Sequence, residues 1–138
     1  MEAKMNKITM SSAELDESDI QTVLEVLRSG RIALGPKAEE FEERIAEYVG
    51  VKYAVAVSSG TSGLHILVKA LGINQGDEVL VPSFTFASTV NVILYERATP
   101  IFIDIEPETY NLDPSHLEKM ITDKTKAIIP VSISGTPM

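Results

Sequence analysis

The chain has 138 residues, of which 44% are hydrophobic and 23% are charged, a composition typical of a folded globular protein. This length allows one domain at most, or a piece of a larger one. The absence of cysteine excludes disulfides, zinc–thiolate sites and cysteine nucleophiles. A net charge of −8 argues against a nucleic-acid partner, and no apolar run approaches the roughly 18 residues of a membrane span. Because the N-terminus also lacks a signal-peptide core, we expect a cytoplasmic protein without a membrane partner.

Two amphipathic helices are predicted before residue 51. The first ends at Gly30, which suits a left-handed cap, and the second begins at Pro36 and ends at Gly50. The apolar positions of the first helix are Ile20, Val23, Leu24 and Leu27. Those of the second helix, its predicted inward face, are Ala38, Phe41, Ile45, Tyr48 and Val49.

The outer face of the second helix is acidic. We interpret these acids as a solvated surface, because contiguous exposed carboxylates usually serve solubility, and we predict no metal site there. The residues concerned are Glu39, Glu40, Glu42, Glu43 and Glu47.

From residue 51 onward, strands and helices alternate. Strands are predicted at 54–57, 78–81, 100–105 and 126–133, although Pro130 removes one donor from the last. Helices are predicted at 61–71, from about Thr85, and after Asp113–Pro114. Their apolar stripes are Leu64, Leu67, Val68 and Leu71 in the first, Phe86, Val90, Ile93 and Leu94 in the second, and Leu117, Met120 and Ile121 in the third. This rhythm predicts an α/β fold with a mostly parallel sheet and flanking helices, whose ligands bind at the carboxyl ends of the strands.

The turn between the predicted strand 54–57 and its helix is built of small residues. Its sequence, SSGTSG at 58–63, leaves the first amides of the helix unpaired at the positive end of the helix dipole. Such a place binds anions, typically phosphate, and Gly60 allows close backbone approach while Thr61 and Ser62 offer hydroxyls. The alternative is that Ser59 or Thr61 merely caps the helix, and short Gly/Ser motifs alone leave the two interpretations about equal.

A second polar and aromatic segment, PSFTFAST at 82–89, follows the next predicted strand. It would suit a flat heteroaromatic ring beside a phosphate, although Phe84 and Phe86 taken alone are more often core residues. The sequence lacks the P-loop and the dinucleotide fingerprint, and His65 and His116 lie on different predicted helices without a metal-binding partner. We interpret His65 as a packing or capping residue.

Several blocks in order resemble the DegT-type aminotransferases. They are SSGTSGL at 58–64, GDEVLVPSFTFASTVN at 76–91, ATPIFID at 98–104 and TKAIIPV at 125–131, with further matches around Gly35–Pro36 and Phe41–Gly50. The resemblance implies the fold of aspartate aminotransferase, a homodimer or other homo-oligomer, and the cofactor pyridoxal 5′-phosphate (PLP). It further implies a nucleotide-sugar substrate, an amino donor that is usually glutamate, and a place in amino-sugar or surface polysaccharide biosynthesis.

The resemblance also assigns site residues by position. Thr61, with the backbone at Gly60 and Ser62, matches the family's cofactor-phosphate site, and Phe86 matches the aromatic residue that stacks on the pyridine ring. The family's pyridine-binding aspartate and its cofactor-binding lysine would lie beyond residue 138, and the tail SISGTPM departs from the family's pattern. We therefore predict no catalytic residue in this chain.

Two organisations of the chain follow. The first is a helical segment at 1–50 followed by an incomplete PLP-binding large domain at 51–138, the N-terminal fragment of an enzyme that is inactive alone. The alternative is a non-catalytic phosphate-binding or assembly module derived from the same family. An unrelated α/β phosphate-binding protein is disfavoured by the ordered blocks.

Overall fold

The computed structural model describes residues 11–33 and 35–138. By their contacts, the residues form two compact units, Met1–Ala56 and Val57–Met138, which we describe separately. These units are groups of contacting residues, so the predicted division into domains at 1–50 and 51–138 stays a prediction.

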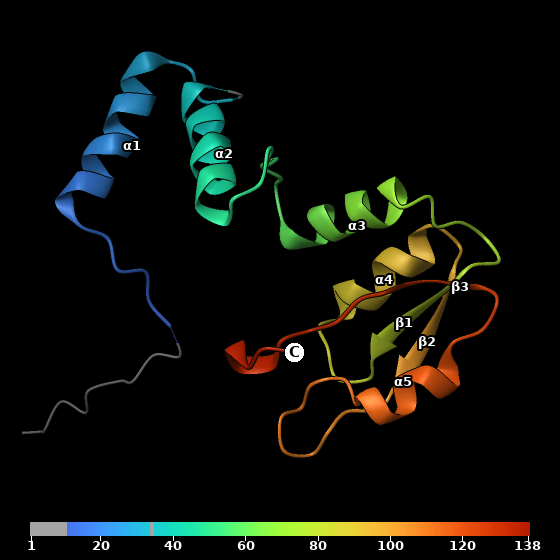
Figure 1. Ribbon diagram of the computed structural model, residues 1–138. Helices are drawn as coiled ribbons and strands as arrows, with labels where there is room; N and C mark the ends of the chain where they lie inside the picture. Colours follow the sequence, from blue (N-terminus) through green and yellow to red (C-terminus); the bar gives the residue numbers. More distant parts are fainter. Residues whose placement is uncertain (1–10, 34) are drawn as a thin grey trace, which may run out of the picture. The chain divides into compact units, whose positions relative to one another are not determined.

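The first unit contains two helices, α1 (Glu17–Ser29) and α2 (Pro36–Val49) (Figure 1). Asp16 caps α1 in a capping box with Asp19, and Gly30 ends it in the left-handed conformation with φ of 70°. Gly50 ends α2 in the same way, with φ of 75°. The predicted helices and their ends are thus confirmed.

The second unit is built on three parallel strands in the order β2-β1-β3. The strands are β1 (Glu78–Pro82), β2 (Thr99–Ile103) and β3 (Thr125–Ile128). The helices are α3 (Gly60–Ala70), α4 (Ala87–Tyr95) and α5 (Pro114–Met120), with a short 3₁₀ helix, η1 (Ile133–Gly135). This arrangement confirms the predicted α/β class with parallel strands.

The central strand β1 is buried on both faces because its side chains alternate between two hydrophobic clusters. Val79 and Val81 pack with residues of α3 and α4, whereas Leu80 packs with Ile103 and residues around α5. Figure 1 accordingly shows α3 and α4 on one side of the sheet and α5 on the other. A short apolar strand therefore holds the core, as the run of apolar residues indicates.

The predicted strand at 54–57 is wrong. These residues adopt no strand, and Val55 is 77% exposed. A strand is defined by its ladder of hydrogen bonds, and no described segment pairs with this one. The predicted strands at 100–105 and 126–133 are too long, because pairing with β1 ends at Ile103 on one side and at Ile128 on the other.

The predicted helical faces are only partly buried. Val68, Ile93 and Ala46 are buried, and Leu64, Val90 and Leu117 pack against the two clusters. Most of the remaining residues of these predicted stripes are exposed in the described part of the chain. The exposed ones are Ile20, Val23, Leu24, Leu27, Phe41, Ile45, Tyr48, Val49, Leu67, Leu71, Phe86, Leu94, Met120 and Ile121.

Candidate functional site

The N-terminus of α3 has the open amides that the sequence predicts. The Ser59 side chain caps the helix by accepting a hydrogen bond from the Ser62 amide at 3.2 Å. The Gly63 amide donates to the Ser59 carbonyl, which leaves Gly60 and Thr61 at the two positions that have no partner inside a helix. Capping therefore uses only one of the first amides, and the cap is compatible with the predicted anion site.

Three serine hydroxyls form a small cluster beside these amides. The Ser62 hydroxyl lies 3.2 Å from that of Ser58 and 3.0 Å from that of Ser59. The half-buried Thr61 makes no side-chain hydrogen bond within the described part of the chain. Of the predicted hydroxyls, that of Thr61 is therefore the one left for a ligand, whereas that of Ser62 is held by its neighbours.

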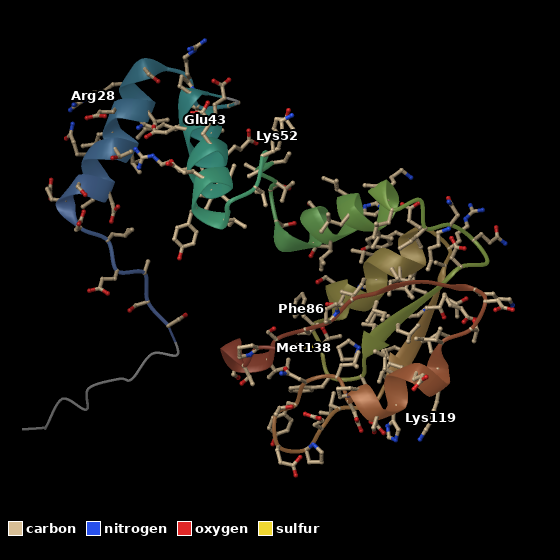
Figure 2. All side chains as sticks on the ribbon, in the orientation of Figure 1. Arg28, Glu43, Lys52, Phe86, Lys119 and Met138 are labelled. Carbon is tan, nitrogen blue, oxygen red and sulfur yellow. The ribbon has the colours of Figure 1, made fainter. Side chains whose placement is uncertain are left out.

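Phe86 lies at the beginning of α4, on the side of the sheet where β1 ends (Figures 1 and 2). It occupies the N-cap position without a capping hydrogen bond and is 77% exposed, and Phe84 is 52% exposed. The interpretation of these two residues as core is therefore wrong. Phe84 instead contacts the ring of Tyr110, with ring centroids 5.9 Å apart.

Glu96, at the C-terminal end of α4, contacts the middle and the last turn of α3. One of its carboxylate oxygens lies 2.8 Å from His65 Nε2, and the other accepts from Lys69 Nζ at 3.1 Å. The hydrogen bond with His65, followed by that from Lys69, lowers the pKa of the Glu96 carboxyl below its ordinary value. His65 also packs edge-on against Tyr95, so it packs as predicted and does not cap a helix.

Asn111 is a structural residue that the sequence reasoning missed. It is 5% exposed, and its side-chain nitrogen donates to the carbonyls of Thr136 and Pro137 while its oxygen accepts from the Ile133 amide. These bonds hold the segment around η1 to the loop before α5. A lone asparagine after Tyr110 gives no periodic signal, so only the tertiary contacts identify it.

The described residues contain no group of three side chains able to hold a metal ion, and none of their helices is both long and apolar enough to span a membrane.

The sequence model of the DegT/DnrJ/EryC1/StrS aminotransferase family matches residues 13–138. The chain belongs to this family. The resemblance inferred from the ordered motif blocks is thereby confirmed.

The chain is also similar to individual proteins. The chain is 49% identical over 110 residues to the UDP-2-acetamido-2-deoxy-3-oxo-D-glucuronate aminotransferase of Pseudomonas aeruginosa, covering 80% of this chain and 31% of that protein. It is 46% identical to the spore coat polysaccharide biosynthesis protein SpsC of Bacillus subtilis, covering 88% and 31%. Among solved structures, a GDP-4-keto-6-deoxymannose-3-dehydratase with a trapped PLP-glutamate geminal diamine matches with a TM-score of 0.90 and 30% identity, covering 96% and 36%. The chain thus spans about a third of the length of the relatives it matches.

The residues at the start of α3 and α4 fit the phosphate and the ring of PLP. A Cβ added at Gly60 would meet no atom within 4 Å, so the space beside the free amides is open to a ligand. Amides, one unengaged hydroxyl and an exposed aromatic face are the groups that a phosphorylated pyridine ring requires. The fit therefore rests on four groups of the chain itself, which are the amides of Gly60 and Thr61, the Thr61 hydroxyl and the ring of Phe86.

Proposed function

We propose that this chain supplies the phosphate-binding turn and the ring-stacking aromatic residue of a PLP-dependent aminotransferase that acts on keto sugars linked to nucleotides. The observation that carries the proposal is the pair of free amides at Gly60 and Thr61, together with the exposed Phe86 at the start of the neighbouring helix. The names of the relatives support the substrate class, since they include a UDP-sugar aminotransferase and a GDP-sugar enzyme.

In this proposal each group of the chain has a defined task. The amides of Gly60 and Thr61 and the Thr61 hydroxyl bind the cofactor phosphate, aided by the dipole of α3. Phe86 covers one face of the pyridine ring and fixes its tilt. When bound, the cofactor supplies the electron sink for transfer of an amino group, while the protein provides binding and orientation.

The experiment that tests the phosphate site is a nuclear magnetic resonance titration with inorganic phosphate. We expect the largest shifts at the amides of Gly60 and Thr61. Replacing Gly60 by valine should abolish binding without unfolding the chain, because the added side chain enters open space and the backbone there is not left-handed.

The matched control is Ala70→Val, which adds the same branched side chain at the exposed far end of the same helix. We expect this variant to bind phosphate like the parent chain. Equal phosphate affinity in Gly60→Val and in the parent chain would contradict the site.

A non-catalytic module that keeps the phosphate turn is the second candidate, and the positions of the lysines fit both candidates, since neither places a catalytic lysine in this chain. Lys69 lies in the last turn of α3, about 12 Å along the helix axis from the free amides, and is paired with Glu96. Lys126 lies near the start of β3, away from the carboxyl ends of the strands. Stoichiometric labelling of one lysine by PLP and borohydride would contradict both candidates. The DNA downstream of the codon for residue 138 distinguishes them, since only the enzyme requires a cofactor-binding lysine encoded there.

The remaining properties belong to the same proposal and rest on family membership. They are a homo-oligomeric assembly, glutamate as the amino donor, a cytoplasmic location and a part in amino-sugar or surface polysaccharide synthesis. The trapped PLP-glutamate species of the dehydratase supports the donor, and the name of SpsC supports the polysaccharide connection.

A further inference from the structure

Glu96 is held in place by the end of α4. It is the C-cap residue, and the next residue, Arg97, turns the chain toward β2 with φ of 58°. The amides of Arg97 and Ala98 donate back to the carbonyls of Leu94 and Ile93, which fixes this turn. The Glu96 carboxylate, with 12% of its side chain exposed, is therefore a rigidly mounted acceptor.

Both oxygens of this carboxylate point to α3. One contacts His65 and the other Lys69, which lie one turn apart on the same face of α3. Within the described residues, all side-chain hydrogen bonds between α3 and α4 pass through Glu96. The rest of the contact between these helices is apolar, through residues such as Val68, Val92 and Ile93.

Apolar contact and a two-point polar contact constrain a helix pair differently. Burial of apolar surface is itself non-directional, and apolar contact constrains the register of two helices only through the fit of their side chains. Two charge-assisted hydrogen bonds from successive turns fix both sliding and rotation. A shift of α3 relative to α4 moves the amides of Thr61 and the ring of Phe86 relative to each other, because each lies at the start of its helix.

We infer that Glu96 is a positioning residue, which through His65 and Lys69 sets the distance and angle between the phosphate-binding turn and the aromatic ring of Phe86. This inference rests on the proposed function of that site. The partners of Glu96 are 40% and 69% exposed, so the contact adds little to overall stability, and its role is to set geometry.

The test uses two probes that share a phosphate and differ in whether they carry a pyridine ring. Inorganic phosphate needs the start of α3 alone, whereas pyridoxamine phosphate needs α3 and Phe86 together. Pyridoxamine phosphate has the ring and the phosphate but no aldehyde, so it forms no imines with surface lysines. Dissociation constants are measured on the 138-residue chain from the shift of the Thr61 amide.

A charge-swap cycle separates positioning from a simple loss of charge. We expect Glu96→Lys and Lys69→Glu each to weaken pyridoxamine phosphate binding about fivefold, and the double variant to recover to within about twofold of the parent. A long-range effect of the changed charge would alter the affinities for phosphate and for pyridoxamine phosphate alike. We therefore expect the ratio of these two affinities to differ from that of the parent only in the single variants. Glu40→Lys, which breaks two ion pairs on the surface of the other unit, is the control and should change neither affinity.

The outcomes distinguish the inference from the proposal on which it rests. A parent chain that binds neither probe at the start of α3 refutes the proposed function itself. A parent chain that binds both, with single variants that weaken them equally or a double variant that recovers nothing, refutes the positioning role alone. Glu96→Gln, which keeps the shape of the side chain, provides the same comparison if the lysine variant does not fold.

Discussion

Two segments of this chain have the same plan and different outcomes. Residues 54–70 and residues 78–95 both read as an apolar strand, a polar turn and a helix. In the second segment the strand is β1, and its residues Val79 to Val81 are fully buried. In the first, residues 54–57 form no strand and only the helix α3 is present.

The difference lies in the neighbours of each segment. β1 pairs with β2 on one side and with β3 on the other, and helices cover both of its faces. Among the described residues of the first unit, residues 54–56 have one backbone hydrogen bond to their surroundings, a 2.7 Å bond from the Ala56 amide to Glu42. A strand sequence thus becomes a strand only where a partner satisfies its backbone groups.

The largest expected effect is the difference in stability between two valine-to-alanine variants, one in each segment. Val79→Ala should lower the free energy of unfolding by about 2 kcal/mol, because it removes two buried methyl groups and leaves a cavity. Val55→Ala should change it by less than about 0.5 kcal/mol, since Val55 is 77% exposed. Urea unfolding measures both. Equal losses would mean that residues 54–57 are buried in solution, which would contradict the difference between the two segments.

The two helices also differ at their first residues, which gives a second, smaller effect. Ser59 caps α3, whereas α4 begins with Phe86, a residue that cannot cap. Phe86→Ser should therefore raise the free energy of unfolding by about 0.5–1 kcal/mol by supplying the missing cap. The same variant should weaken pyridoxamine phosphate binding by about 1 kcal/mol, because the aromatic face is lost.

Stability and ligand affinity measured together show whether the aromatic residue at the N-cap of α4 serves ligand binding or packing. Phe86→Tyr is the control, since it keeps the ring and should preserve ligand affinity. A less stable Phe86→Ser variant with unchanged affinity would make Phe86 a packing residue.

Much of the fold was predictable from the sequence, for local reasons. Caps such as Asp113–Pro114 and the left-handed Gly30 and Gly50 define helix ends through interactions within a few residues. Burial was less predictable, because helical spacing marks a face such as Leu67 and Leu71 without showing what covers it. The site shows the same difference between local and long-range interactions. The free amides of α3 were evident from the turn, whereas the Glu96 contact joins residues 31 positions apart and leaves no local pattern.

The smallest expected effect is on the pH dependence of stability, and it comes from the hydrogen bonds of Glu96 with His65 and Lys69. Hydrogen bonds from these residues lower the pKa of the Glu96 carboxyl in the folded chain. A lowered folded-state pKa stabilises the chain fully above the pKa of the unfolded state, and the stabilisation is lost as the pH falls through the folded-state pKa.

The stability difference between the parent chain and Glu96→Gln should therefore shrink as the pH is lowered from about 5 to about 3. The other carboxyls with lowered pKa values, Asp16, Glu40 and Asp113, are present in both proteins and cancel in the difference. The exposed partners make the effect small and sensitive to salt, so the unfolding curves need low ionic strength. A difference that stays constant over this range would show that Glu96 is not bound to α3 as a carboxylate. The two segments would then be held together by their apolar contacts alone.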